Sequence, residues 1–320
     1  MSDSKGVLFG REASILVGSA SEVLDLSEFR FRFEIHQSDA VTPNTLVARV
    51  YNLDDSTVNK IFGQNGGRSE YTKTVIQAGY KGNVAVIFDG TIKQLMRGKE
   101  SNVDNVLDIY AGEWDLPYAF STVNQTLAAG ATQQDQLNAV GAAPGEGDPP
   151  VDPDALPPPI GGILARGKVL WGLKRDYYRS IGATTGRRIS VQSGKFVSIP
   201  VTGYLEAEVV VLDSASGLIG VPETTQNGVT ATCLLNPKIR IGTRVHINNR
   251  DLNTTIITNR AVGGAQGGTV LFASVAADGI YRVAAIDYEG DTRGTAWYSQ
   301  ITALAIDPTA DPSMAVQEYG

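Results

Sequence analysis

The sequence predicts an α+β protein that is mainly β, and three observations lead to this prediction. The stretch FRFRFEIHQ at 29–37 alternates strictly between apolar and polar side chains, as a strand with one buried face does. The chain contains 35 glycines and many β-branched residues, which is typical of numerous turns and strands. Helical spacing is concentrated between 116 and 182, so we expect a small α+β region between two β regions.

The first third is predicted to be β with one helix. NTLVARVYNL at 44–53 is the expected antiparallel partner of the alternating strand, and 54–63 has the pattern of a short helix with Ser56 at its N-cap. The stretch 72–95 is predicted as strand, turn and strand with a bend at Asp89-Gly90, and another strand follows at 105–115. Such a set of strands predicts a small barrel or closed sheet.

The middle of the chain has a different pattern. Residues 116–130 and 131–143 have helical spacing, and Thr132 with Asp135 resembles a capping arrangement. Proline and glycine dominate 144–162, which we interpret as an exposed insertion or linker. An amphipathic helix that ends at Gly182 is predicted over 168–182, and a hairpin over 187–200.

The last third returns to β. Residues 216–249 predict two or three strands, 263–273 a glycine-rich turn into a strand, and 279–307 strand, loop and strand. The expected organisation is therefore a β region at 1–115, an α+β region at 116–215 with its insertion at 144–162, and a second β region at 216–320.

Composition argues against several classes of function. The net charge of −7 does not favour a general nucleic-acid binder. The chain has no run of about 18 apolar residues, so we expect no membrane-spanning helix, and its first residues do not have the pattern of a signal peptide. His36 and His246 have no neighbours at metal-ligand spacing, and the single cysteine, Cys233, fits a reducing cytosol and a buried position in a strand. We therefore predict no metal and no cofactor.

No catalytic motif of the common hydrolase, metalloprotease or nucleotide-binding type is present, and we predict no catalytic residue. Glu206 and Glu208 would share one face of a strand at 204–213, and paired carboxylates can serve glycoside hydrolysis. A tail-associated cell-wall hydrolase that uses Glu206, or a glycan-binding β protein, therefore remains an alternative. A solvated strand face is the simpler interpretation of the two glutamates.

One basic cluster stands out between 238 and 260, where Asp251 is the only acidic residue. The cluster contains Lys238, Arg240, Arg244, Arg250 and Arg260, and Arg240, Arg244 and His246 should point away from an apolar face. A solvated face, a contact with an acidic protein and a contact with nucleic acid are all compatible with this pattern. We choose a protein interface, with the candidate residues Lys238, Arg240, Arg244, His246 and Arg250.

Four segments, taken in order, resemble the baseplate hub proteins of contractile-tailed bacteriophages. They are VYNLDDSTVNKIF at 50–62, VIQAGYKGNVAVIFDGTI at 75–92, GLIGVPETTQNGVTATCLLNPKIRIGTRVHI at 217–247 and DGIYRVAAIDYEGDTRGTAWYSQITAL at 278–304. The last two in tandem are the more specific. Two features depart from the family pattern: the insertion at 144–162, and Asp287-Tyr288 where the family has a histidine.

The resemblance implies two tube-like antiparallel β-barrel domains separated by the α+β domain. It further implies a homotrimer whose pseudo-sixfold ring adapts the hexameric tail tube to a trimeric spike and lines a central channel. The implied partners are the tail tube or tube-initiator protein, the spike, baseplate wedge proteins and the tape-measure protein, with DNA only in transit. The expected location is the virion tail baseplate, assembled in the bacterial host cytoplasm.

Overall fold

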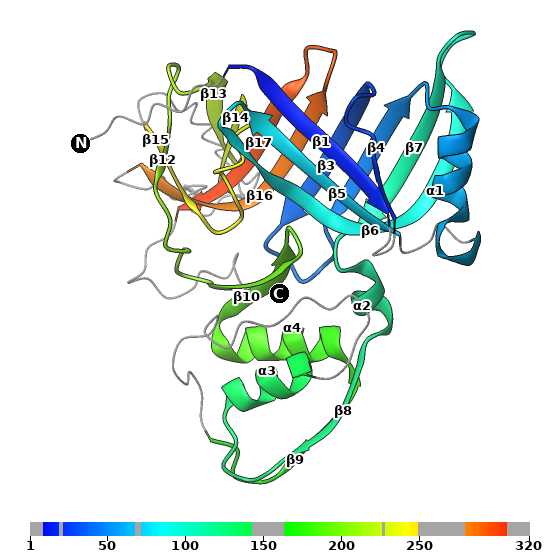
Figure 1. Cartoon of the computed structure of the whole chain (residues 1–320). Coiled ribbons are helices and arrows are strands. Elements are labelled where there is room, and N and C mark those ends of the chain that lie inside the picture. The colour runs from blue at the N-terminus through cyan, green and yellow to red at the C-terminus, as the bar shows by residue number, and fades with distance from the viewer. Residues whose placement is uncertain are drawn as a thin grey trace, which may run out of the picture.

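A long sheet, antiparallel except for the pair β12–β15, forms most of the molecule, and Figure 1 shows it above the helical region. The computed structural model describes residues 9–18, 22–67, 72–142, 163–225, 228–248 and 279–305. In the first third the sheet contains β1 (Arg11–Gly18), β2 (Val23–Asp25), β3 (Phe31–Ser38), β4 (Thr45–Tyr51), β5 (Lys73–Tyr80), β6 (Asn83–Lys99) and β7 (Asn105–Gly112). From the last third it contains β12 (Val210–Leu212), β13 (Leu218–Thr225), β14 (Gly228–Leu234), β15 (Arg244–Ile247), β16 (Ile280–Asp291) and β17 (Trp297–Ala305).

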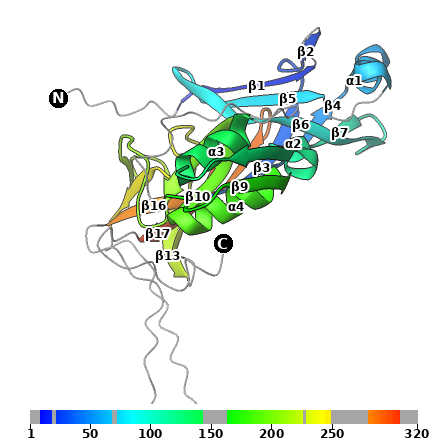
Figure 2. The same ribbon diagram turned by 90° about the horizontal axis from the view of Figure 1, so that it is seen from below.

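The order of the strands brings the two ends of the chain into one sheet. The order is β13-β14-β17-β16-β3-β4-β7-β6-β5-β1-β2, and β15 and then β12 extend the sheet from β16. The strands from the first and last thirds meet where β3 pairs with β16, with Phe33 opposite Gly290 and Glu34 opposite Glu289. Figure 2 shows β1 and β5 on the other side of the molecule from β16 and β17, so the sheet curls over its own core.

Strict alternation explains why one face of this sheet is buried. Along β3 the side chains of Phe31, Phe33 and Ile35 are buried, and those of Arg32, Glu34 and His36 are exposed. A single apolar cluster contains these β3 residues together with side chains from β16 and β17, among them Trp297 and Ile301. The prediction of an α+β, mainly β fold is confirmed, and the division into two barrel domains stays a prediction.

The helical elements form a separate group, apart from α1 (Asp55–Gly67), which lies beside β7 in Figure 1. This group, the α+β unit, contains α2 (Asp115–Phe120), β8 (Thr122–Leu127), α3 (Gln133–Ala142), β9 (Lys168–Leu173), α4 (Lys174–Thr185), β10 (Arg187–Gln192) and β11 (Lys195–Pro200). It has its own apolar core, built from residues such as Leu137, Tyr178 and Ile189. The predicted insertion at 144–162 and the stretch 263–273 lie outside the described residues.

Two predicted helices are wrong in part, because each contains a strand. The stretch 122–127, predicted as helix, is β8, and 168–173 is β9; the two strands pair antiparallel as a two-stranded sheet. Helix α4 therefore starts only at Lys174, and it ends at Thr185 rather than at Gly182, with Gly186 as its cap in a left-handed conformation (φ 62°). Pairing between segments 46 residues apart decided these structures, and local periodicity cannot show such pairing.

Smaller predictions have mixed outcomes. The hairpin at 187–200 is confirmed, and its turn residues Ser193 and Gly194 have the positive φ angles, 50° and 72°, that a tight hairpin turn requires. Asp54, not Ser56, caps α1, because its carboxylate accepts hydrogen bonds from the backbone N–H groups of Ser56 and Thr57. The expected bend at Asp89-Gly90 lies inside β6, and the chain instead turns at Lys81-Gly82.

A buried polar cluster joins the α+β unit to the sheet. The carboxylate of Glu113, which is fully buried, accepts hydrogen bonds from Asn44 Nδ2 at 2.6 Å, from the N–H of Asp89 at 3.2 Å and from the N–H of Gly194 at 3.1 Å. Burial raises the pKa of Glu113 to about 7, although these three donors act in the opposite direction. The carboxyl group of Glu113 thus binds the tip of the β10–β11 hairpin, and Asn44 and Gln192 add further hydrogen bonds between the hairpin and the sheet.

Candidate functional site

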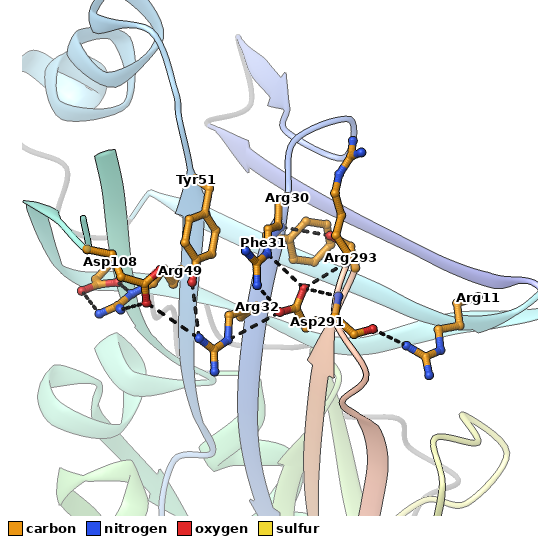
Figure 3. Close-up of polar contacts among 12 residues, drawn as sticks. Arg11, Arg30, Phe31, Arg32, Arg49, Tyr51, Asp108, Asp291 and Arg293 are labelled. Carbon is orange, nitrogen blue, oxygen red and sulfur yellow. Dashed lines mark hydrogen bonds and ion pairs between the residues drawn. The ribbon is translucent and has the colours of Figure 1, made fainter. Parts of the chain in front are cut away.

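The end of β16 and the turn that follows it, residues 290–295, are held against the start of β3 by a network of arginines (Figure 3), and we call this segment the β16–β17 loop. We call this set the arginine row: Arg11, Arg30, Arg32, Arg49 and Arg293. Alternation along β3 places Arg32 on the polar face, and Arg30 immediately precedes the strand. The loop has the sequence GDTRGT, which belongs to one of the segments that resemble phage hub proteins.

Asp291 is the centre of this network. Its carboxylate accepts hydrogen bonds from Arg30 Nη2 at 2.7 Å and from the backbone N–H groups of Arg293 at 2.9 Å and Gly294 at 2.8 Å. Its side chain is only 7% exposed, and burial alone would raise the pKa of the carboxyl group. The hydrogen bonds from Arg30 and the loop outweigh that effect, so the pKa lies below its ordinary value and the group stays ionised.

Backbone contacts fasten the rest of the loop. Thr292 exchanges hydrogen bonds with Phe31: its N–H donates to the carbonyl of Phe31 at 3.0 Å, and its hydroxyl accepts from the N–H of Phe31 at 3.1 Å. Arg11 donates to the carbonyls of Gly294 and Thr295, at 2.9 and 3.0 Å, and Arg293 donates to the carbonyl of Glu28 at 3.2 Å. Elements from both ends of the chain therefore converge on one short loop.

Gly290 and Gly294 lie at positions where the Cβ of any other residue would be too close to a neighbouring side chain. A Cβ at Gly290 would lie 2.3 Å from the ring of Phe33, and one at Gly294 would lie 2.5 Å from the carboxylate of Asp291. The residues of the GDTRG stretch therefore have identifiable structural roles: the two glycines allow close approach, and Asp291, Thr292 and Arg293 make the hydrogen bonds that hold this segment against the start of β3 and the residues before it.

The arginine row continues across β3, β4 and β7. Arg49 pairs with Asp108 through two hydrogen bonds of 2.6 and 3.0 Å and with Glu100 at 3.1 Å, an arrangement that raises the pKa of the guanidinium group. Arg32 donates to the hydroxyl of Tyr51 at 3.4 Å, and the guanidinium of Arg30 lies 4.5 Å from the centre of the Tyr51 ring. Arg30, Arg32 and Arg49 thus have carboxylate partners among the described residues. Arg11 and Arg293 donate hydrogen bonds only to backbone carbonyls.

Beside the row, the polar face of the sheet is hollowed by two shallow grooves of about 410 and 220 Å³. The larger groove is centred on the pairing of β3 with β16, where His36 pairs with Asp287 and this contact raises the pKa of the imidazole. Glu34 stands directly opposite Glu289, and neither makes an ion pair with a described residue. This face is polar and carries more carboxylates than cations.

The basic residues predicted from the sequence have two different environments. Lys238 and Arg240 are exposed in the turn that precedes β15, and neither forms an ion pair with a described residue. Arg244 instead lies over the ring of Tyr204 at 4.3 Å and donates to the carbonyl of Ala207 at 3.1 Å, next to the half-buried His246 on β15. Arg250 lies outside the described residues.

The apolar residues between them are buried as the alternation predicts, namely Ile239, Ile241, Val245 and Ile247. Within 216–249, where two or three strands were predicted, the structure describes β13, β14 and β15. Residues 237–243 form turns, so only 244–247 of the basic stretch is a strand. The interface role of the basic residues stays a prediction.

The structure does not place Glu206 and Glu208 on one face of a strand, as the paired-carboxylate interpretation requires. Glu206 and Glu208 lie in an irregular, exposed segment, and the strand expected at 204–213 begins only at Val210. Within the described part of the chain, no three His, Cys, Asp or Glu residues gather in a way that could hold a metal. Cys233 is buried in β14, and burial raises the pKa of its thiol to about 12.

Sequence reasoning missed two buried carboxylates that each accept at least three hydrogen bonds, Asp291 and Glu113. Asp291 is recognisable in the sequence only as part of the GDTRG pattern, and Glu113 follows a strand in AGEWD with no signal of burial.

No helix among the described residues is long and apolar enough to span a membrane.

Comparison with known proteins identifies the fold. No protein-family model matches the sequence, and no curated protein matches it. A tail protein from Neisseria meningitidis MC58 is similar in structure, with a TM-score of 0.55 and 11% identity over 92% of this chain and 96% of that one. The 43 kDa tail protein of prophage MuSo2 from Shewanella oneidensis has a TM-score of 0.56 and 7% identity, over 93% and 98%. Across almost its whole length, the chain therefore has the fold of these two tail proteins.

Proposed function

We propose that this chain is a structural subunit of a phage-type tail, and specifically the baseplate hub. The single observation that carries the proposal is the shared fold, which extends over nine-tenths of this chain and of both tail proteins. The resemblance of four ordered sequence segments to hub proteins supports the finer assignment. In this proposal the chain does no catalysis, and its role is to form contacts that bear force.

The proposed assembly is a homotrimer. Its subunits would each supply two tube-like domains, at 1–115 and 216–320, so that three subunits form a pseudo-sixfold ring between the tail tube and the spike. Such a ring needs a rigid junction between the two domains of each subunit. The network around Asp291 supports this requirement, because it ties β3 to the β16–β17 loop with ion pairs and backbone hydrogen bonds.

The polar face of the sheet suits the channel of such a ring. Glu34, Asp287 and Glu289 lie along it with few opposing cations, and an acidic wall repels the phosphate backbone of DNA in transit. The exposed pair Lys238 and Arg240 would then contact an acidic partner such as the tube, the tube-initiator protein, the spike or a wedge protein. The tape-measure protein would occupy the channel before DNA does.

The proposed location is the baseplate of the virion tail, after assembly in the bacterial cytoplasm. Nothing in the described geometry favours the hydrolase alternative, because the two glutamates it requires lie in an exposed irregular segment. No specific observation favours the glycan-binding alternative over the tail role.

Mass determination in solution, followed by electron microscopy, tests the proposal. We expect a trimer of the 34.0 kDa chain that forms a ring with a central hole, either alone or after addition of the spike protein encoded with it. Immunogold labelling of assembled tails should place the chain at the baseplate. A chain that stays monomeric at high concentration with the spike present, and that is absent from purified tails, would overturn the proposal.

A further inference from the structure

Among the described residues, the first half of β1 has one paired edge and one open edge. The whole of β1 pairs with β5, but β2 covers only Leu16–Gly18 on the other side. On that side the N–H of Ile15 donates to the hydroxyl of Ser27 at 3.1 Å, and its carbonyl accepts from the N–H of Leu26 at 3.0 Å. Beyond Ile15 the strand runs on toward Arg11 with no described strand beside it.

The direction of the free backbone groups follows from this pattern. Alternate residues of a strand direct their N–H and C=O groups to the same edge, so Ala13 and Arg11 face the same side as Ile15. The carbonyl of Gly10 agrees with this assignment, because it accepts from the N–H of Lys81 on the β5 side. No described residue bonds the backbone groups of Ala13 or Arg11 on the open side.

A groove of about 550 Å³ follows this edge. One side is formed by β1, with Gln77 of β5 and Val84 of β6 beside it, and the other by the Ser27–Phe29 turn and the β16–β17 loop. The lining residues also include Ala13, Ser14, Thr292, Arg293 and Trp297. The open stretch of β1 is four residues long, roughly 13 Å at the rise of a strand. The groove therefore has the dimensions of a short extended peptide.

Charges of both signs line the groove. Arg11 and Arg293 donate only to backbone carbonyls, and neither forms an ion pair with a described residue. Glu12 and Glu28 also line the groove without an ion pair to a described residue. Mixed charges suit a polypeptide with acidic and basic side chains, and they do not suit a polyanion such as nucleic acid.

We propose that the open edge of β1 is a docking site for an extended segment of a partner protein, which adds to the sheet as one further short strand. Its backbone pairs with the free N–H and C=O groups of Ala13 and Arg11, as in other cases of strand addition. A carboxylate on the segment meets Arg293. The site does not depend on the hub assignment, because it follows from the edge, the groove and the charges alone.

Peptide binding, measured by fluorescence anisotropy, tests the proposal. The probe is a fluorescein-labelled peptide, TKVEVT, with TKVKVT as its charge-reversed partner. We expect saturable binding of TKVEVT to the full chain. Ala13→Pro removes the N–H from an edge position where proline is tolerated, and it should weaken binding by about tenfold or more. Lys99→Glu, an exposed change on β6, is the matched control and should have no effect.

A charge swap keeps the test independent of folding. Arg293→Glu should weaken binding of TKVEVT by about tenfold and restore it for TKVKVT. No saturable binding up to millimolar peptide, or equal binding by Ala13→Pro and the unchanged chain, would overturn the proposal. Self-association that Ala13→Pro abolishes would identify a second copy as the occupant and would overturn the partner-protein form of it.

Discussion

Arg30 and Asp291 are 261 positions apart in the sequence, yet their side chains form an ion pair with an N–O distance of 2.7 Å. The same carboxylate also accepts the two backbone N–H groups that shape the loop. One buried acid thus connects the strand at the start of the chain with the hairpin at its end.

Replacing this acid should be costly. Asp291→Ala leaves two loop N–H groups and Arg30 without their acceptor, and we expect it to lower the free energy of unfolding by about 3 kcal/mol. Urea denaturation measures the loss. Asp55→Ala removes the exposed partner of Arg97 and should cost less than about 1 kcal/mol. Equal losses of unfolding free energy in the two variants would contradict the prediction that the buried Asp291 network stabilises the fold more than an exposed ion pair does.

Gly290→Ala tests the close approach of β16 to β3. The added methyl group would lie 2.3 Å from the Phe33 ring, so we expect a loss of about 2 kcal/mol in thermal denaturation. Combining it with Phe33→Leu should cost less than the sum of the two single changes, because the smaller side chain relieves the contact. Strictly additive losses would refute the steric explanation.

The pKa of Glu113 predicts how stability depends on pH. Its pKa in the folded chain, about 7, lies above the ordinary value of 4.5, so the folded state holds the proton more tightly than the unfolded state does. The contribution is fully present below about pH 4.5 and is lost as pH rises to 7, to a total of roughly 3 kcal/mol.

Glu113→Gln cannot lose a proton, so it should flatten the slope of unfolding free energy against pH between 5 and 7. Chemical denaturation at a series of pH values measures this slope. Glu208→Gln, at an exposed position, is the control and should leave the slope unchanged. A slope that is the same in Glu113→Gln and in the unchanged chain would contradict the prediction.

His36 should titrate above its ordinary pKa of 6.5, because it hydrogen-bonds to Asp287 across the pairing of β3 with β16. The stabilisation is present below pH 6.5 and disappears as pH rises through the folded pKa; it is small, because both side chains are more than half exposed. An NMR titration of the imidazole measures the pKa. Asp287→Asn should move it back toward 6.5, and an unchanged value would exclude Asp287 as the cause.

The exposed pair Lys238 and Arg240 allows the proposed interface to be tested without damage to the fold. Lys238→Glu/Arg240→Glu should leave the melting temperature nearly unchanged and impair tail assembly and infectivity. Arg244→Glu is the informative contrast, because it removes the contact with Tyr204 and should also lower stability. Normal assembly by the double variant would rule out these two residues as an interface.

Strands with strict alternation could be predicted from the sequence, and so could turns with a clear signal. The residues of β3, the hairpin around Ser193-Gly194 and the pair β16–β17 have such patterns, and the structure contains them. The strand β8 could not be predicted, because TVNQTL is polar and its partner lies beyond the insertion. The sequences of β9 and α4 together have one amphipathic pattern, and the boundary between strand and helix arises because only β9 pairs with β8.

The site was less predictable than the fold. The basic residues at 238–246 could be identified because charged residue types are evident from the sequence. The sequence could not show that Arg244 stacks on the ring of Tyr204 and donates to the carbonyl of Ala207. Asp291 and Glu113 derive their properties from burial and from donors far away in the chain. Such long-range contacts become apparent only after the chain has folded.

The pairing of β3 with β16 also sets the order of events during synthesis. Phe31–Ser38 leaves the ribosome long before Ile280–Asp291, and the delay is roughly ten to fifty seconds at bacterial rates of translation. Throughout that interval β3 presents an unpaired edge and an apolar face that Trp297 and Ile301 later cover. A nascent chain arrested before β16 is therefore the aggregation-prone species, and chaperone demand should last until β16 and β17 have been made.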